Sequence, residues 1–383
     1  MTASIDATAF ARLALFPLVL ATALLVGLWW RQSLRARSPL AQLAAITSLT
    51  LFLCFDLVAF GAYTRLTDSG LGCPDWPGCY EQASPVGAAS PISNEEAARP
   101  EGPVTERKAW IEMLHRYFAG TLGLLVAAMA VLAWRARRER QSAFTWVLLT
   151  LAWFVVQALF GALTVTWKLY PAVVTGHLLG GIGLVALIAW QRALYRRSDA
   201  DEARAAGRPS SNLWRWQADR RVLTFAALVL VAQIALGGWV STNTAVLACA
   251  SFPSCNGPWW PAMHWLEGFT LMHPLHLRAD GSPMSPEALV AIHWTHRLFA
   301  IVAFVTLGGV ALRFRHRAAA RPIAAVLGAL LVLQVLTGIS NVVLRWPLSV
   351  ALAHTAGAAA LVVALCALAS HLRDRDARDA SST

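Results

Sequence analysis

The chain has 383 residues, of which 57% are hydrophobic and only 14% are charged. A chain of this size that is so apolar is not a soluble globular protein, and the composition indicates an integral membrane protein. The net charge of +11 would suit a nucleic-acid partner. The distribution of the basic residues along the chain argues for lipid instead, and we expect no nucleic-acid site.

Apolar runs of about 20 residues, the length that spans a bilayer as a helix, recur along the chain. Backbone groups must be hydrogen-bonded inside lipid, so these runs predict helices and not strands. We expect nine spans, at 10–30, 41–64, 109–134, 143–167, 172–194, 222–242, 288–313, 321–343 and 349–370. The predicted fold class is all-α: tandem pseudo-symmetric four-helix bundles with eight core helices, plus one extra N-terminal transmembrane helix.

Basic residues are spread unevenly over the segments between these spans. With the N-terminus outside, the inner loops and the tail hold 22 of the 32 Lys and Arg residues, and the outer segments hold eight. Because positive residues collect on the inner side, we predict a periplasmic N-terminus and a cytoplasmic C-terminus in a bacterial inner membrane. The first apolar run is followed by its basic residues, the reverse of a secretory signal, so we interpret it as a permanent helix.

The second half of the chain repeats the first. A shared apolar composition does not place cysteine, glutamine and histidine in one register, so we interpret the match as an internal duplication. The matched pairs are Gly61 with Gly237, Cys73 with Cys249, Cys79 with Cys255, His115 with His296, Gln157 with Gln334, Gly161 with Gly338, Lys168 with Arg345, and His177 with His354.

The repeat predicts the domain organisation. Residues 41–194 form a first four-helix half and residues 222–370 a second, joined by a basic cytoplasmic linker at 195–221. Residues 1–40 hold the extra helix with its inner loop, and residues 371–383 form a cytoplasmic tail. Four helices return the chain to the same side of the membrane, so the two halves are parallel and not inverted.

Four histidines mark the outer ends of four spans, two in each half. A histidine at bilayer depth is costly unless something there requires it. Matched pairs are typical of axial haem ligands between helices, so we predict that His115 and His177 bind one haem, and His296 and His354 another. Helix packing with each histidine bonded to a carbonyl or hydroxyl is the plain alternative. Zinc is a weaker one, because nothing in the second half completes a tetrahedral ligand set.

Four basic residues accompany these histidines. Arg116 and Arg297 each follow a histidine directly, and Lys168 and Arg345 end two spans on the outer side. All four are candidates to contact haem propionates. The alternative is that they snorkel to the interface as anchors.

The two halves differ three residues before the first histidine of each pair, where Glu112 stands in one half and His293 in the other. Spacing of three shares a helix face, so we expect Glu112 to look toward whatever His115 binds. A buried carboxyl group there suits proton transfer, which predicts a reacting haem in the first half and a permanent one in the second. An ion pair between Glu112 and Arg116 is the alternative. Asp56, also confined to the first half, suits either a proton relay or an ion pair.

Two outer loops each contain a cysteine pair six residues apart, Cys73 with Cys79 and Cys249 with Cys255. An oxidising periplasm favours a disulfide within each loop, structural by default and redox-active as the alternative for the first. Cys54 and Cys366 lie within spans and are interpreted as packing residues. We expect His264, His273 and His276, in the long outer loop of the second half, to be solvated.

Several of these stretches together resemble one known family. They are the segment from Gly61 to Pro77 (GAYTRLTDSGLGCPDWP), Glu112-Met-Leu-His115-Arg116, Thr175-Gly-His177, His293-Trp-Thr-His296-Arg297 and Ala353-His354. Over residues 41–370 the chain resembles the haem A synthases, which serve cytochrome oxidase assembly. The extra N-terminal helix departs from the eight-helix core usual in that family.

The resemblance implies a reaction and a set of roles. The reaction is oxidation of the C8 methyl group of haem O to the formyl group of haem A, with oxygen derived from water. His115 and His177 would hold haem O, His296 and His354 a haem b with its iron, and Glu112 would be the catalytic carboxylate. The cysteines of the first loop would assist haem delivery or redox chemistry. A haem O synthase and oxidase assembly proteins are implied neighbours, and a homo-oligomer stays open.

Two rival functions remain from the sequence. One is a di-haem membrane electron carrier of the cytochrome b type, which has no use for a carboxylate confined to one site. The other is a non-catalytic haem chaperone for cytochrome oxidase assembly. Neither the electron acceptor nor the role of the loop at 80–108 follows from the residues.

Overall fold

The computed structural model describes residues 27, 39–138, 141–195, 213–278, 280–318 and 320–380. Apart from residue 27, the predicted first span at 10–30 lies outside the described residues, as do most of the linker at 195–221 and the last three residues of the tail. The described part is helical and contains no strand, with only two isolated bridges, Cys79 with Gln82 and Leu277 with Pro283.

Eight of the described helices are long and apolar enough to cross a membrane. They are Pro39–Leu66, Glu106–Ala136, Gln141–Thr166, Pro171–Tyr195, Gln217–Thr242, Pro286–Phe314, Arg321–Val343 and Leu348–His371. Each coincides with one of the eight core spans expected from hydropathy, so the prediction of an all-α integral membrane protein is confirmed. Large apolar side chains such as Leu124, Val305 and Leu336 are more than half exposed, as lipid-facing residues are.

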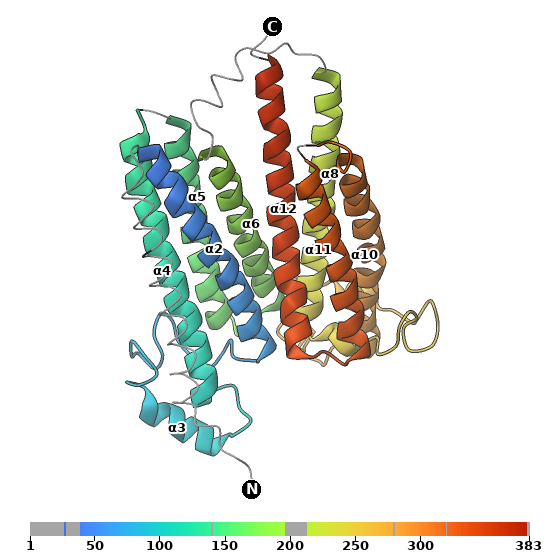
Figure 1. The fold of residues 1–383 in the computed structure, drawn as a ribbon. Coiled ribbons are helices and arrows are strands. Elements are labelled where there is room, and N and C mark those ends of the chain that lie inside the picture. The colour runs from blue at the N-terminus through green and yellow to red at the C-terminus, as the bar shows by residue number, and fades with distance from the viewer. Residues whose placement is uncertain are drawn as a thin grey trace. The chain divides into compact units, whose positions relative to one another are not determined.

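The described chain divides into two compact units, Met1–Trp167 and Lys168–Thr383. The first contains α2 (Pro39–Leu66), α3 (Ala89–Ala98), α4 (Glu106–Ala136) and α5 (Gln141–Thr166). Helix α4 packs on both α2 and α5. The short helix α3 belongs to the loop after α2 and packs on α4 near its N-terminal end (Figure 1). This loop and α4 together form the outer part of the first unit.

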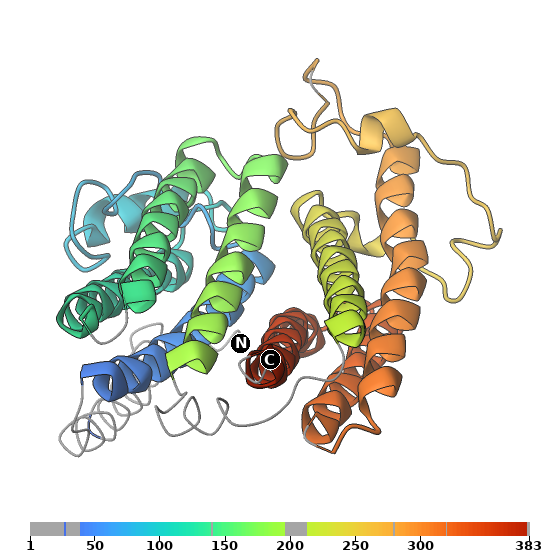
Figure 2. The ribbon, with the colours of Figure 1, turned by 90° about the horizontal axis from the view of Figure 1, so that it is seen from above.

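The second unit contains the remaining helices. They are α6 (Pro171–Tyr195), α8 (Leu213–Thr242), the 3₁₀ turn η1 (Ala245–Leu247), α9 (Trp265–Gly268), α10 (Pro286–Phe314), α11 (Arg321–Val343) and α12 (Leu348–Ala380). Helices α8, α10, α11 and α12 form a closed bundle, in which α8 lies beside α10, α10 beside α11, α11 beside α12, and α12 beside α8. Figure 2 looks along these helices and shows α8 next to α10.

Helix α6 departs from the domain boundary that the repeat predicts. It packs on α8 and α12, and the Thr175 and Thr242 hydroxyl groups lie 3.1 Å apart between α6 and α8. The halves of the sequence are defined by the repeat, whereas the compact units are defined by which helices contact each other. The two divisions differ only in the placement of α6. The four-helix halves at 41–194 and 222–370 therefore stay a prediction about the repeat.

The backbone itself carries the repeat. Residues with side chains adopt left-handed φ at matching positions in the two halves: Asp68 and Thr244, Tyr80 and Asn256, Lys168 and Arg345, and Leu169 and Trp346. Side chains make this region unfavourable by about 1 kcal/mol or more per residue. Matching exceptions at the same register, in loops of different sequence, support an internal duplication.

Corresponding helices also begin in the same way. Thr105 caps α4 by accepting the Lys108 N–H at 3.2 Å, and Ser285 caps α10 by accepting the Ala288 N–H at 3.3 Å. Glu106 and Glu287 stand in the two first turns, where a negative charge complements the helix dipole. These caps fix the residues at which α4 and α10 begin. They therefore also fix how far along each helix His115 and His296 lie.

Candidate functional site

The second bundle brings His296 and His354 together. His296 lies on α10 and His354 on α12, and the two rings are close enough for their charges to interact. Both residues are half-buried, so the rings keep accessible surface among the helices. That the pair binds one haem stays a prediction.

Each of these rings is held through its Nδ1 atom. The Thr337 hydroxyl oxygen lies 2.8 Å from Nδ1 of His354, and the Gln233 amide nitrogen lies 3.2 Å from Nδ1 of His296. The Gln334 amide also donates to the His354 carbonyl at 3.0 Å. The Thr337 oxygen can accept from Nδ1–H of His354, which leaves Nε2 of that ring for a metal, the arrangement usual for metal-bound histidine.

A glycine on the neighbouring helix makes room for each ring. An added Cβ at Gly237 would lie 3.0 Å from Cε1 of His296, and one at Gly338 would lie 3.3 Å from Cε1 of His354. In the first unit, a Cβ at Gly61 of α2 would lie 3.0 Å from Cε1 of His115 on α4. Matched glycines therefore set the position of three of the four histidine rings.

This donor set fits a haem iron better than an isolated ion. No group of three or more His, Cys, Asp or Glu side chains gathers in a metal-binding arrangement within the described ranges. A tetrahedral zinc site needs four ligands, whereas a porphyrin supplies four of its own and requires two axial imidazoles. Two imidazoles with engaged Nδ1 atoms and a glycine beside each satisfy that requirement.

The binding of one haem by both His115 and His177 stays a prediction. His115 lies on α4 in the first unit, with its ring stacked on Phe60 at a centroid distance of 6.1 Å. His177 lies on α6, which belongs to the second unit. The prediction that both bind one haem is carried forward on the repeat alone.

Gly357, three residues after His354, makes room for a side chain of the neighbouring helix. In the structure an added Cβ at Gly357 would collide with the side chain of Gln334. Gly357 therefore admits Gln334, whose amide fixes the His354 carbonyl.

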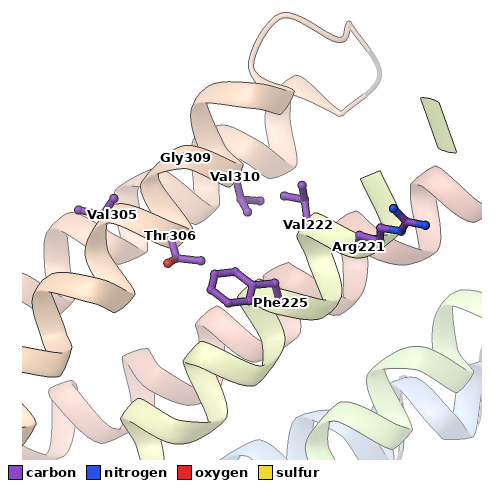
Figure 3. Close-up of a pocket in the computed structure, with 7 residues that line it drawn as sticks. All are labelled: Arg221, Val222, Phe225, Val305, Thr306, Gly309 and Val310. Atoms are coloured by element: carbon purple, nitrogen blue, oxygen red, sulfur yellow. The ribbon is translucent and has the colours of Figure 1, made fainter. Parts of the chain in front are cut away.

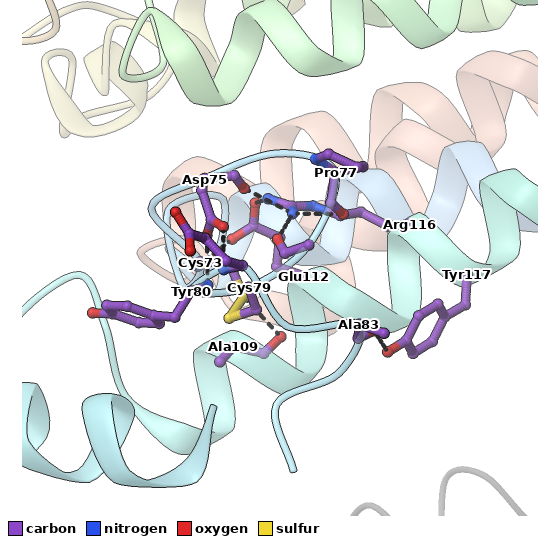
Figure 4. The surroundings of a disulfide bond; sticks show 12 residues. Cys73, Asp75, Pro77, Cys79, Tyr80, Ala83, Ala109, Glu112, Arg116 and Tyr117 are labelled. Atoms are coloured by element: carbon purple, nitrogen blue, oxygen red, sulfur yellow. Dashed lines mark hydrogen bonds and ion pairs between the residues drawn. A yellow bond between two sulfur atoms is a disulfide. The ribbon is translucent and has the colours of Figure 1, made fainter. Parts of the chain in front are cut away.

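Glu112 points at the first disulfide loop. Its Oε2 accepts the backbone N–H of Cys73 at 2.8 Å, and its Oε1 accepts from Arg116 at 2.5 Å. The residue is only 4% exposed, and Figure 4 shows it enclosed between the loop and α4. The ion pair weighed as an alternative is thus present. The orientation toward the ligand of His115 stays a prediction.

Arg116 and Arg297 fasten the two disulfide loops to their helices. Arg116 donates to the carbonyl groups of Asp75, Pro77 and Gly78, as Figure 4 shows in part. Arg297 donates to the carbonyl groups of Cys249, Ser251 and Ser254. The predicted contacts of Arg116 and Arg297 with haem propionates stay predictions.

His293 takes the place of Glu112 in the second half. Its Nδ1 lies 3.3 Å from the backbone nitrogen of Cys249, and its Nε2 lies 3.1 Å from Nε of Arg297. Both neighbours are donors, and a neutral imidazole has one acceptor nitrogen, so it accepts only one of them at a time. A carboxylate accepts both, which is what Glu112 does.

The two predicted disulfides are present in the structure. Cys73 pairs with Cys79 and Cys249 with Cys255. All four cysteines are fully buried, and in the first loop they pack with Val104, Ala109 and Met113. Cys54 is a buried free cysteine, and the Cys366 thiol lies 3.8 Å from the Ala186 carbonyl. Both agree with packing roles.

The remaining predicted contacts lie at the surface. Lys168 and Arg345 are exposed and sit in matching left-handed turns between helices. Asp56 is half-buried on α2. Their functional roles stay predictions.

The structure corrects one of the three loop histidines. His264 and His276 are exposed, as expected, but His273 is 1% exposed. Its ring packs edge-on against Trp239 at 5.9 Å, and Nδ1 lies 2.8 Å from the Pro274 carbonyl. The long loop folds back on the bundle, and sequence polarity alone does not reveal that fold.

A pocket in the second unit lies away from the histidines. It has a volume of about 430 Å³ and opens between α8 and α10, lined mainly by apolar side chains with Arg221 and Thr306 (Figure 3). Arg221 precedes Gln233 by 12 residues, which corresponds to about 18 Å along the helix. The pocket is therefore separate from the candidate site.

Comparison with known proteins gives one consistent result. The family model described as "Cytochrome oxidase assembly protein" (COX15-CtaA) matches residues 44–366. A protein named "Heme A synthase" from Shewanella oneidensis is 36% identical over 324 residues, covering 85% of this chain and 94% of that protein. Proteins of the same name from Rhizorhabdus wittichii and Bacillus cereus are 25% and 27% identical, covering 83% and 85% of this chain and 90% and 91% of their own lengths.

Proposed function

This chain belongs to the COX15-CtaA family of cytochrome oxidase assembly proteins, and on that premise we propose that it converts haem O to haem A. The observation that carries the proposal furthest is the pairing of His296 and His354, with Nδ1 of each ring engaged by a neighbouring side chain. The likeness to a protein named "Heme A synthase" covers 85% of this chain. Together they favour a haem enzyme over a carrier of some other ligand.

The proposed reaction oxidises one methyl group of the substrate haem to an aldehyde. A methyl group and one water give a formyl group, four protons and four electrons, so the reaction needs an electron acceptor and a proton acceptor. The oxygen atom enters from water. The identity of the electron acceptor is left to experiment.

Each half has its own part in the proposal. His296 and His354 would hold a haem b through Nε2, and this resident group would supply one-electron redox chemistry. His115 and His177 would hold haem O as substrate. Gly61 sets the position of the His115 ring, as Gly237 does for His296.

Glu112 is the proposed proton acceptor of the first half. Its carboxylate is buried and bound to Arg116, and it connects α4 to the loop that carries Cys73. A carboxylate can take up a proton at either oxygen, whereas the imidazole of His293 at the matching position already faces two donors. The two halves therefore still differ chemically by a carboxylate at this position, and this carboxylate also binds the first disulfide loop.

The proposal extends to the membrane and to neighbours. We place the N-terminus in the periplasm and the C-terminus in the cytoplasm of a bacterial plasma membrane, because the predicted inner loops hold most of the basic residues. Haem O would be handed over by a haem O synthase, and haem A would pass to cytochrome oxidase assembly. Whether the protein forms a homo-oligomer is part of the test.

The test is the identity of the haems that co-purify with the protein. We expect haem b with haem O or haem A in the wild type. Glu112→His installs the side chain that holds the loop in the second half, so it keeps the loop in place and removes the carboxylate. We expect this variant to retain haem b and to accumulate haem O with at least a 10-fold loss of haem A.

Two outcomes would contradict the proposal. Haem b in both sites, with no haem O or haem A, would identify a di-haem electron carrier. Undiminished haem A formation by the Glu112→His protein would show that the carboxylate is structural, and it would favour a chaperone or a different proton acceptor. The yield of folded variant, measured by size-exclusion chromatography, separates a lost reaction from a lost protein.

A further inference from the structure

We propose that the pocket between α8 and α10 binds one anionic phospholipid, with the lipid phosphate at Arg221 and an acyl chain along the apolar lining. This is the pocket of about 430 Å³ that lies away from the histidines (Figure 3). Lipid binding at this place is independent of the proposed haem chemistry.

The lining residues form a row that runs inward from the membrane surface, with Arg221 at one end and Val305 at the other (Figure 3). Arg221 lies four residues, or about 6 Å, from the start of the apolar span Gln217–Thr242, and Phe225 lies eight residues, or about 12 Å, from it. Val305 lies nine residues, or about 14 Å, from the end of α10 at Phe314. A cation at interfacial depth, followed by apolar residues at hydrocarbon depth, matches the order of headgroup and chain in a phospholipid.

The pocket is open on the surface that the two helices present to the bilayer. Phe225 is 58% exposed and Val305 is 66% exposed, whereas Val310 behind them is 1% exposed. Gly309 is also exposed, and nothing lies within 4 Å of a Cβ built at that position, so the missing side chain leaves open space. Acyl chains surround a spanning helix at this depth, and we therefore infer that an acyl chain fills the space.

The charge at this end of the two helices selects an anionic lipid. Residues 217–225 and 311–321 together hold six arginines and one aspartate, a net charge of +5 with histidine neutral. The aspartate, Asp219, already accepts from Arg313 and Arg317. The Arg221 guanidinium group has no ion pair or hydrogen bond within the described part of the chain. A guanidinium group binds phosphate oxygens well, and basic groups near the membrane surface attract anionic lipid.

The first half of the chain does not repeat this combination of residues. In the register that places Gly237 over Gly61, Arg221 falls on Ala45. In the register that places His296 over His115, Gly309 falls on Ala128. The repeated scaffold therefore requires neither an arginine nor a glycine at these positions, which agrees with a role other than packing in the second half.

The experiment measures phospholipid binding to the full-length protein in detergent. Delipidated protein is titrated with dioleoylphosphatidylglycerol, native mass spectrometry gives the occupancy of the tightest site, and thermal unfolding gives the accompanying stabilisation. We expect Arg221→Ala to bind the tightest lipid about fivefold more weakly, the effect of one basic side chain near a membrane surface. Arg221→Lys keeps the charge and should bind nearly as tightly as the wild type. Gly309→Leu fills the open space and should lose this lipid.

Each of these variants has a matched control. Arg321→Ala removes the same charge from an exposed arginine at the start of α11 that does not line the pocket. Gly120→Leu adds the same side chain at an exposed glycine of α4, where nothing lies within 4 Å of a Cβ either. We expect both controls to bind the tightest lipid as the wild type does.

Three outcomes would overturn the proposal. Equal losses in Arg221→Ala and Arg321→Ala would show a diffuse attraction and not a site. Equally tight binding of dioleoylphosphatidylcholine would remove the selection for an anionic headgroup. Stabilisation by inorganic phosphate alone, as large as that by the lipid, would exclude the apolar lining from the site. If Gly309→Leu does not fold, the comparison of Arg221→Ala with Arg321→Ala still decides.

Discussion

Glu112 and His293 hold the two disulfide loops in the same way, although one is an acid and the other an imidazole. Each lies beside the backbone N–H of the first cysteine of its loop and beside the arginine four residues later in its helix. The position is therefore structural in both halves. The two halves differ in the side chain at this shared position, which is a carboxylate in one half and an imidazole in the other.

This relationship predicts the effect of exchanging the residue in the second half. His293→Ala removes the one acceptor that the Cys249 N–H and the Nε of Arg297 share, at a cost of about 1–3 kcal/mol in the free energy of unfolding. His293→Glu supplies an acceptor for both donors and should be at least as stable as the wild type. Thermal unfolding in detergent measures the order. A His293→Glu protein as unstable as His293→Ala would contradict the shared role.

The glycine beside each histidine predicts a graded spectroscopic effect. In Gly237→Ala the new methyl group would lie 3.0 Å from Cε1 of His296, so the ring must shift by a few tenths of an ångström. We expect a shifted haem b absorbance and faster haem loss. Gly309→Ala is the control, because nothing lies within 4 Å of a Cβ at that position. Equal spectra for the two variants would remove the glycine from the site.

The buried acid near the N-terminal end of α8 predicts a loss of stability when it is replaced. Asp219 is 4% exposed and accepts from Arg313 at 2.8 Å and from Arg317 at 2.5 Å. Removing a buried partner leaves charges uncompensated, and because both arginines are partly exposed we expect Asp219→Asn to cost about 1–3 kcal/mol.

Asp68→Asn is the matched comparison for that ion pair. Asp68 pairs with Lys108 at 3.3 Å, and its side chain is 70% exposed. An exposed pair contributes less than about 1 kcal/mol, so this variant should unfold close to the wild type. Similar losses for the two variants would mean that burial does not decide the strength of the Asp219 pair.

The long outer loop predicts a pH dependence. Burial acts to raise the pKa of Glu267, but bonds from the Ser285 backbone and hydroxyl and from Arg278 outweigh it and hold this pKa below the ordinary value of 4.5. A carboxylate whose folded pKa is lowered stabilises the loop above the unfolded pKa, and this stabilisation is lost as the pH falls through the folded pKa.

Limited proteolysis across this pH range tests the loop. We expect cleavage near residues 264–285 to increase as the pH is lowered below about 4.5. Glu267→Gln should be cleaved readily at neutral pH and show little further change. Cleavage of the wild type that does not vary between pH 7 and pH 3 would contradict this account.

The sequence predicted the spans and the disulfides well, because both follow from local rules. Runs of apolar residues have the length of a bilayer, and two cysteines six residues apart in a short loop have few other partners. The contact of Glu112 with the first disulfide loop could not be predicted from the sequence, for a physical reason. Helical spacing defines a face, but it does not show that the chain before the helix folds back and covers that face with the Cys73 N–H.

Gln233 and Thr337 do not stand out in the sequence, because the repeat points to residues that the two halves share. Both stand out only as differences, opposite Leu57 and Phe160, each within one helical turn of a matched glycine. The assignment of α6 to the second unit was also beyond the sequence. A repeat records how the gene grew, whereas packing depends on side chains from distant helices.

The paired left-handed turns at Lys168–Leu169 and Arg345–Trp346 bear on the origin of the two halves. These four residues have side chains, and each adopts an unfavourable left-handed backbone conformation in a tight turn between two helices. The amino acids at the matching positions differ between the two halves. Because both turns fall at one register of the repeat, the shared backbone supports the interpretation of an internal duplication. At these positions the two halves share the backbone conformation although their amino acids differ.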